Sequence, residues 1–168
     1  MNRACRTKYP KKLLTAAIEG SLLLDELLSN SFVRELHTRL YGDIWIWAGR
    51  WRQREVNIGV APEQIAVELR SCLDTIRYRW EHTDNWTARA LGITTHAETV
   101  RIHPFINGNS CATRLLADLV FIAAQDVAQC NTTGASTSGT YIELLRGFDM
   151  HRNAGELAAF IGVQSIDS

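Results

Sequence analysis

The chain has 168 residues, 46% of them hydrophobic, which is enough for one domain with a proper core. Its 18 basic and 18 acidic residues give a formal net charge of zero. That balance disfavours a dedicated nucleic-acid binder, which would need a basic face. The sequence has no apolar run of membrane-spanning length and no signal-peptide core, so we expect no membrane association.

The cysteines are scattered along the chain and match neither a zinc pattern nor a disulfide framework. They are Cys5, Cys72, Cys111 and Cys130. We therefore expect a reducing cytoplasm as the location. Charge is uneven at the start, where residues 1–12 contain five basic residues and no acidic one. This basic N-terminal segment is either a solvated chain end or an electrostatic contact to a partner.

The first part of the chain predicts two helices. Nearly continuous apolar residues indicate a helix over 13–28, in which Gly20 marks either close packing or a break. The next helix covers about 31–40 and has Asn30 or Ser31 as its N-cap.

An unusually aromatic stretch follows at residues 44–51 and contains Trp45, Trp47 and Trp51. We expect these rings to fill a wall of the core, and a shelf that stacks a nucleobase is the less favoured alternative. Alternating apolar residues over 52–60 then favour a strand within a short hairpin or flap.

The second part predicts more helices, a polar surface loop and no internal repeat. The helices cover about 62–80, 86–101, 110–128, 141–148 and 154–161, and the loop covers 129–139. Since helices far outnumber the single possible hairpin, we expect a mostly α domain.

The most informative stretch joins two of these helices at residues 102–114. Gly108 can adopt the positive φ angles that a tight turn needs. The helix start that follows leaves backbone N–H groups without partners and suits an anion such as phosphate. Arg114 lies four residues after Ser110, on the same helix face. With His103 upstream, the stretch favours phosphate chemistry over a plain helix–loop–helix junction.

The same stretch resembles the core motif of the Fic family, which is His-Pro-Phe-x-acid-Gly-Asn-Gly-Arg-x-x-Arg. This chain reads His103-Pro104-Phe105-Ile106-Asn107-Gly108-Asn109-Ser110-Cys111-Ala112-Thr113-Arg114. The resemblance continues upstream at residues 32–40, at Trp47-Ala48-Gly49-Arg50 and at Asn57-Ile58-Gly59, and covers about residues 13–161. Within the family, the chain most resembles the bacterial type called mobile mystery protein B.

The resemblance implies a Fic-fold helical bundle with a short β-hairpin flap. It also implies an adenylyltransferase that moves AMP from ATP, with Mg²⁺, to a Ser, Thr or Tyr hydroxyl of a protein. His103 would be the general base, a role suited to a side chain that titrates near neutral pH. The phosphates would contact Gly108, Asn109, Ser110, Cys111 and Arg114, of which Arg114 would hold the terminal phosphate. The flap residues Val56, Asn57, Ile58 and Gly59 would dock the target by adding a strand to it.

A second short motif lies in the first predicted helix. Thr15, Glu19 and Gly20 resemble the family's inhibitory motif, Ser/Thr-x-x-x-Glu-Gly/Asn. The resemblance implies that Glu19 pairs with Arg114 and denies the terminal phosphate its partner. The chain would then consist of the basic segment 1–12, an inhibitory helix over 13–28 and a Fic-like core over 29–168. A homo-oligomer is compatible with this organisation.

Three positions depart from the core motif. Asn107 replaces the acid and makes a weak Mg²⁺ ligand, because Mg²⁺ favours carboxylates. Ser110 replaces a glycine and adds a Cβ near the phosphates. Cys111 replaces an arginine and removes a permanent cation and bidentate phosphate donor. We therefore expect weak or absent AMP transfer.

These departures leave alternatives to an autoinhibited adenylyltransferase. One is a Fic-fold protein that uses another nucleotide donor. Another is a catalytically dead protein that binds a nucleotide or a protein partner without turnover. A plain helical interaction domain that matches by chance, and nucleophilic catalysis by Cys111 with His103, are the least favoured interpretations.

Overall fold

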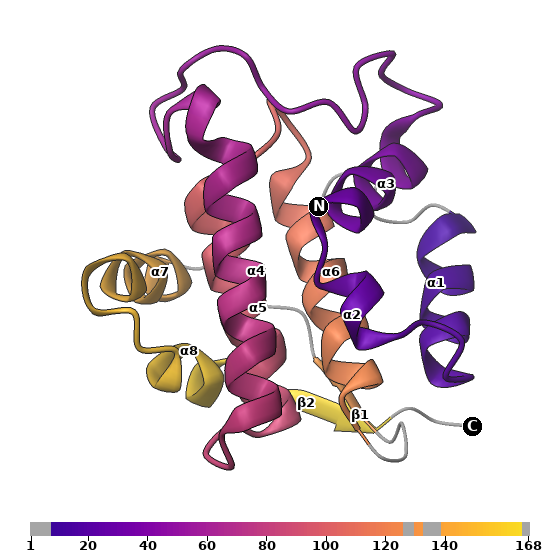
Figure 1. Cartoon of the computed structure of the whole chain (residues 1–168), viewed down its shortest axis with the longest axis vertical. Coiled ribbons are helices and arrows are strands. Elements are labelled where there is room, and N and C mark those ends of the chain that lie inside the picture. The colour runs from indigo at the N-terminus through magenta and orange to yellow at the C-terminus, as the bar shows by residue number, and fades with distance from the viewer. Residues whose placement is uncertain (1–7, 126–129, 133–138, 166–168) are drawn as a thin grey trace.

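The computed structural model describes residues 8–125, 130–132 and 139–165. The helices are α1 (Lys8–Ile18), α2 (Leu24–Leu27), α3 (Asn30–Tyr41), α4 (Ile65–His82), α5 (Ala88–Ile102), α6 (Asn109–Ala123), α7 (Gly139–His151) and α8 (Gly155–Phe160), with a 3-10 turn, η2 (Pro62–Gln64), before α4. Two short strands, β1 (Cys130–Thr132) and β2 (Val163–Ser165), complete the elements (Figure 1). The expectation of a mostly α domain is confirmed.

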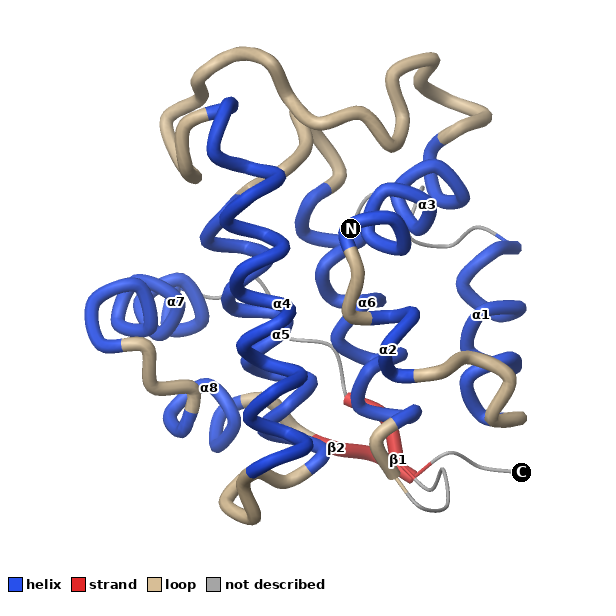
Figure 2. Tube along the Cα trace, viewed as in Figure 1, coloured by secondary structure: helices blue, strands red, loops and turns tan. Residues whose placement is uncertain are grey.

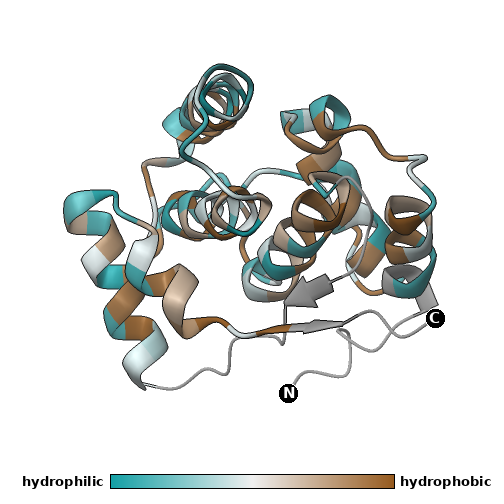
Figure 3. Ribbon diagram, turned by 90° about the horizontal axis from the view of Figure 1, so that it is seen from below, coloured by the Kyte–Doolittle hydropathy of each residue, from teal (hydrophilic) through white to brown (hydrophobic). Residues whose placement is uncertain are grey.

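The centre of the fold is the pair of α5 and α6, which run side by side in opposite directions (Figure 1). Helix α4 covers one side of this pair, whereas α1, α2 and α3 pack on the α6 side. Gly92 allows the close approach of the two central helices, because a Cβ there would lie 2.9 Å from the Ala117 carbonyl oxygen. The buried hydrophobic residues of the main core come from all of the helices α1 to α6, and Figure 3 colours the ribbon by residue hydropathy.

A second, smaller core cluster attaches the C-terminal helices to this bundle. Ile93 and Ala97 of α5 pack there with Tyr141 and Phe148 of α7 and with Leu157 of α8. All five side chains are at most 5% exposed. The packing fixes α7 against the central helix pair, beside the candidate site.

The predicted helix over 13–28 is wrong in its middle. Helix α1 ends at Ile18, and the chain turns at Gly20, whose φ is +70°. Regular helix resumes only at Leu24. Of the two alternatives for Gly20, the break is the one observed, and its positive φ is a conformation that glycine adopts readily.

The predicted cap of the helix over 31–40 is wrong, because the observed cap is the preceding serine. Helix α3 is capped by Ser29, whose hydroxyl accepts a hydrogen bond from the Phe32 N–H at 3.1 Å, rather than by Asn30 or Ser31. Asn30 instead donates a hydrogen bond to the Ala66 carbonyl at 2.8 Å and ties α3 to α4. The cap of α5 is Thr87, whose hydroxyl accepts a hydrogen bond from the Ala90 N–H at 3.1 Å.

The predicted strand over 52–60, and with it the β-hairpin flap, is wrong. This segment belongs to a long irregular connection between α3 and α4 that crosses the top of the molecule (Figure 2). The observed strand pairing is elsewhere, between β1 and β2, where Asn131 lies opposite Gln164 in an antiparallel register. The predicted loop over 129–139 therefore contains a strand, and its residues 133–138 lie outside the described part of the chain.

Most of the basic N-terminal segment, residues 1–7, also lies outside the described residues, whereas Lys8, Lys11 and Lys12 belong to α1. None of the described helices is both long enough and apolar enough to cross a membrane.

Candidate functional site

The candidate site is built on the turn between α5 and α6. Helix α5 ends at Ile102, and His103 follows in the left-handed region with φ 52° and ψ 62°. For a residue other than glycine this backbone conformation costs free energy, so surrounding contacts must hold it. The turn closes through Asn109, whose amide oxygen accepts from the Phe105 N–H at 2.9 Å and whose amide nitrogen donates to the Phe105 carbonyl at 2.7 Å.

This use of Asn109 differs from the nucleotide contact implied by its place in the motif. Its side chain is only 5% exposed and both of its polar ends are occupied by the Phe105 backbone. Asn109 therefore shapes the turn, and only its backbone N–H could face a phosphate.

Helix α3 forms the floor of the turn through His37, which is fully buried. The Gly49 N–H donates to its Nδ1 at 3.0 Å, so that nitrogen is the acceptor and Nε2 carries the proton. Nε2 then donates to the Asn107 carbonyl at 3.0 Å. The imidazole also stacks on Phe105 with ring centroids 3.8 Å apart. His37 thus connects the turn to two other parts of the chain.

Gly108 fits closely above this floor. Its φ is +80°, and a Cβ there would lie 2.5 Å from the Tyr41 ring and 3.1 Å from Nε2 of His37. The Tyr41 hydroxyl donates to the Gly108 carbonyl at 3.3 Å. Glycine is therefore required at this position both for conformation and for space.

Arg52 holds the other side of the turn and is only 2% exposed. Its Nε donates to the His103 carbonyl at 2.8 Å, and its backbone N–H donates to the Pro104 carbonyl at 2.9 Å. Its guanidinium also hydrogen-bonds the carbonyls of Arg54 and Val60. The buried Arg52 therefore holds both His103, in its left-handed conformation, and the segment 52–60, which the sequence predicted to be a strand.

The segment 55–60 lies against His103, as the flap interpretation requires, although it is not a strand. A Cβ on Gly59 would come within 2.7 Å of the His103 Cβ. The Val60 N–H donates to the Ile102 carbonyl at 3.3 Å. Val56 and Ile58 are 41% and 60% exposed, so apolar side chains face solvent next to the histidine.

His103 itself is half-buried. Burial, and then the nearby Arg52 cation, lower the pKa of its imidazole below the ordinary value of 6.5. The ring is therefore neutral at pH 7 and has a nitrogen able to accept a proton.

The three departures from the motif lie together at the start of α6. Asn107 and Ser110 are exposed, and Cys111 is disulfide-bonded. The disulfide corrects the expectation of unpaired thiols and removes the argument for a reducing compartment. It also excludes a Cys111 thiolate acting as a nucleophile with His103 in this structure.

Arg114 lies one turn further along α6 and faces α7. Its Cζ is 5.6 Å from the centroid of the Tyr141 ring, and its Nε and Nη2 are buried without a hydrogen-bond partner. Tyr141 in turn hydrogen-bonds His96 of α5, which is only 3% exposed. Sequence reasoning missed His37, Tyr41, Arg52, His96 and Tyr141, since each acts through a contact distant in sequence.

A family model described as Fic/DOC matches residues 27–121, more than half of the chain. The chain belongs to the Fic/DOC family. Its matched region starts after α1 and includes α3, the irregular connection, the α5–α6 turn and most of α6. The finer assignment to the mobile mystery protein B type stays a prediction.

Solved structures with similar folds are themselves Fic proteins. A Fic domain-containing signalling protein from Bacteroides thetaiotaomicron has 20% identity and a TM-score of 0.67 over 86% of this chain. This chain covers 55% of that protein, about half its length. The Bartonella tribocorum effector BepC, solved with bound AMPPNP, has 13% identity and a TM-score of 0.64, with 95% of this chain and 85% of that chain covered.

The effector Bep8 from Bartonella sp. 1-1C has 15% identity and a TM-score of 0.65, with 93% of this chain and 80% of that chain covered. At these identities the likeness establishes the Fic fold alone.

The Fic inhibitory pair expected between Glu19 and Arg114 is not formed in this structure. Glu19 is exposed and follows the end of α1, with its N–H bonded to the Thr15 carbonyl at 2.9 Å. Figure 1 shows α1 and α6 running in the same direction, so α1 ends far from the α5–α6 turn. An inhibitory role of Thr15, Glu19 and Gly20 stays a prediction.

The aromatic stretch behaves as the expected wall. Trp45 packs against the main core, and its ring stacks between Tyr41 and Trp47 with centroids 4.6 Å from each. Trp51 packs on Phe105 of the Fic motif with ring centroids 5.2 Å apart. These rings therefore support the turn from the α3 side.

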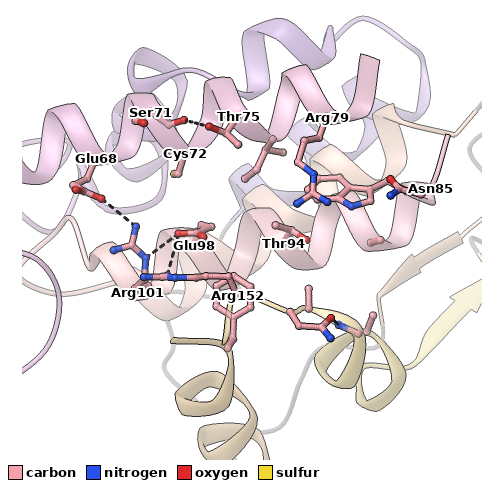
Figure 4. Close-up of a pocket in the computed structure, with 18 residues that line it drawn as sticks. Glu68, Ser71, Cys72, Thr75, Arg79, Asn85, Thr94, Glu98, Arg101 and Arg152 are labelled. Atoms are coloured by element: carbon pink, nitrogen blue, oxygen red, sulfur yellow. Dashed lines mark hydrogen bonds and ion pairs between the residues drawn. The ribbon is translucent and has the colours of Figure 1, made fainter. Parts of the chain in front are cut away.

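A groove lies away from the Fic motif, between α4, α5 and the α7–α8 region (Figure 4). Its volume is about 670 Å³, and none of residues 102–114 lines it. Arg101 donates to Glu68 at 3.2 Å and to Glu98 at 2.8 Å, and Arg152 lies 3.5 Å from Glu98. These four charged side chains are mutually paired, and Arg79, which also lines the groove, lies over the Trp86 ring with its Cζ 4.6 Å from the ring centroid.

Proposed function

We propose that this chain is a Fic-type protein nucleotidyltransferase that moves AMP from ATP to a Ser, Thr or Tyr hydroxyl of a target protein. The observation that carries the proposal is His103, a half-buried and neutral imidazole held on a firmly anchored turn directly before α6. Membership of the Fic/DOC family and the fold shared with nucleotide-binding BepC support it.

In the proposed reaction, the His103 imidazole takes the proton of the target hydroxyl as the hydroxyl oxygen bonds to the α-phosphorus of ATP. The bond from that phosphorus to the oxygen that bridges to the β-phosphate breaks. Pyrophosphate leaves, and AMP remains on the target oxygen. A positioned base of this kind contributes about 10²–10⁴ in rate.

Two features of the chain support a phosphate-bearing donor. No side chain caps the start of α6, so the N–H groups of its first turn are available to the α- and β-phosphates. Arg114 has two buried nitrogens without partners, and this pair could bind a terminal phosphate in a bidentate manner. Ser110 and Cys111 would contact the phosphates through their backbone N–H groups.

The residues present do not fit a protein-held Mg²⁺. The position of the family acid is Asn107, whose side chain is an uncharged and exposed amide. No cluster of His, Cys, Asp or Glu able to hold a metal occurs within the described ranges. Because Mg²⁺ favours carboxylate ligands, no step of the proposed reaction runs through it.

The proposed activity is slow, because the phosphate side of the site lacks donors. Losing one preorganised donor at a developing charge lowers a rate by roughly 10²–10³. Cys111 cannot supply the contacts of the arginine it replaces, and its sulfur is part of a disulfide.

Target docking would use the exposed segment 55–60. Val56 and Ile58 supply apolar side chains, and Asn57 and Gly59 lie between them. A target segment placed along these residues would bring its hydroxyl next to His103.

The test is incubation of the purified chain with ATP labelled at the α-phosphate, because that phosphorus stays on the product. We expect slow labelling of the chain itself or of an added target protein, and no labelling by the His103→Ala variant. Absence of labelling, together with absence of ATP binding in a calorimetric titration, would contradict the proposal.

A second candidate is a protein that binds a nucleotide without transferring it. The disulfide-bonded Cys111 at the place of a phosphate-binding arginine favours this alternative. Binding of ATP in the titration without any labelled product, for ATP or for other nucleotide donors, would identify it.

A further inference from the structure

The contact between Arg114 and Tyr141 has a consequence for access to the site. Arg114 projects from α6 toward α7 and lies against the Tyr141 ring, with its Cζ 5.6 Å from the ring centroid. Tyr141 is only 5% exposed, so its ring is buried where it contacts the arginine. The residue that would bind a terminal phosphate is therefore occupied by another part of the same chain.

Tyr141 is itself held firmly in this position. Its hydroxyl hydrogen-bonds Nε2 of His96, and its ring belongs to the small core that also contains Phe148. Burial raises the pKa of Tyr141, so its hydroxyl stays protonated at neutral pH. The position of the ring is thus fixed by α5 and by the packing of α7.

The polar atoms around this contact are incompletely satisfied. Nε and Nη2 of Arg114 are buried and have no hydrogen-bond partner. Nε and Nη2 lie on one edge of the guanidinium and form the fork that binds phosphate or carboxylate in a bidentate manner. Buried and unpaired donors destabilise the conformation that contains them. The guanidinium is hydrogen-bonded to the Tyr141 side chain, while its Nε–Nη2 edge has no partner.

We propose that α7 restrains the site, with Tyr141 keeping the Arg114 fork closed until the tyrosine is displaced. This inference rests on the proposed function, because it concerns the access of a terminal phosphate to that site. Glu19, the residue expected to perform this restraint, is exposed and does not contact Arg114. The restraint is therefore assigned to the C-terminal side of the fold.

The test compares ATP binding by calorimetry for the full chain and for Tyr141→Ala, which uncovers the fork. We expect Tyr141→Ala to bind ATP roughly tenfold more tightly, equivalent to about 1.4 kcal/mol. AMP should show no such gain, because it lacks the terminal phosphate. Tyr141→Leu gives the same comparison with more of the core volume retained, should the alanine variant unfold.

Two control variants make the assignment specific. Tyr78→Ala removes an exposed tyrosine of α4 and should leave ATP affinity unchanged. Phe148→Leu loosens the same small core without removing the Arg114 contact, and should change the affinity less than twofold. An equal gain in Phe148→Leu would contradict the assignment to Tyr141.

The outcomes separate this inference from the proposed function. Equal or weaker ATP binding by both Tyr141 variants, with clear binding by the unchanged chain, would overturn the inference and leave the function standing. If neither the unchanged chain nor any folded variant binds ATP, the proposed function is overturned, and the restraint with it.

Discussion

The two halves of the Fic motif differ in how firmly the rest of the fold holds them and in how closely they match the family motif. Residues 103–109 form a turn whose carbonyls and amides are held by buried side chains from two other segments. Residues 110–114 carry an exposed serine, a disulfide-bonded cysteine and an arginine turned toward α7. The half that would move a proton departs from the motif only at the exposed Asn107, whereas the half that would bind phosphates is altered or closed.

This difference shows that a loop and its chemistry can be preserved separately. The turn is part of the folding core, since Phe105 is fully buried and stacks on His37. Changing the turn would destabilise the domain, whereas changing Ser110 alters an exposed position at the helix start. Because the fold needs this turn for its stability, His103 keeps its position even in a weakly active protein.

The largest expected effect comes from breaking the preserved half at His37. His37→Ala leaves the Gly49 N–H and the Asn107 carbonyl without their buried partner and opens a cavity beside Phe105. We expect the free energy of unfolding to fall by about 3–5 kcal/mol, measured by urea denaturation. His82→Ala removes an exposed histidine of α4 and serves as the control. The free energy of unfolding should fall by at least about 1 kcal/mol more in His37→Ala than in His82→Ala. A smaller difference between the two variants would contradict the structural role of His37.

The next largest effect is expected from lowering the pH, which should reduce the free energy of unfolding. Burial lowers the pKa of His96 from 6.5 to about 4, and burial also lowers the pKa values of His37 and His103. As the pH falls below 6.5, these histidines become protonated in the unfolded chain but stay neutral in the folded chain. Stability should therefore be lost between pH 6.5 and 4, by on the order of 3 kcal/mol for His96 alone. The measurement is urea unfolding at a series of pH values.

His96→Gln supplies the control for this titration, because glutamine cannot take up the proton. The variant should lose less stability than the unchanged chain over the same pH interval, whatever its stability at pH 7. An identical slope in both proteins would show that His96 does not titrate as the structure indicates.

A smaller effect is expected at Gly108, near the end of the first half of the motif. Gly108→Ala forces a Cβ into the left-handed region and toward the Tyr41 ring. We expect a loss of about 2 kcal/mol in thermal or urea unfolding. Gly139→Ala, at a glycine with open space around its missing Cβ, should be nearly neutral and provides the control.

The smallest effect is expected from Glu19, which directly follows the end of α1, and the quantity measured is the affinity for ATP. Because Glu19 is exposed and away from Arg114, Glu19→Gly should change ATP affinity by less than about twofold, measured by calorimetry. A rise in affinity that exceeds the rise for Tyr141→Ala would restore Glu19 as the inhibitory residue and move the restraint to α1.

The helices and the phosphate-type turn could be predicted from the sequence, because periodicity and the preference of Gly108 for positive φ are local signals. The strand over 52–60 could not be judged correctly. Its apolar residues alternate as in a strand, but the segment is irregular. It is held by Arg52 and the turn rather than by pairing with a neighbouring strand. The supporting residues His37 and Tyr141 were also missed, because their roles depend on contacts across the fold.

The most direct test of the central claim restores all three departures from the motif and then removes His103. The combined variant Asn107→Asp, Ser110→Gly and Cys111→Arg should transfer label from α-labelled ATP about 10²–10³ times faster than the unchanged chain. Adding His103→Ala should abolish that gain. A restored chain that folds but still does not transfer label, or one whose transfer survives the loss of His103, would contradict the account.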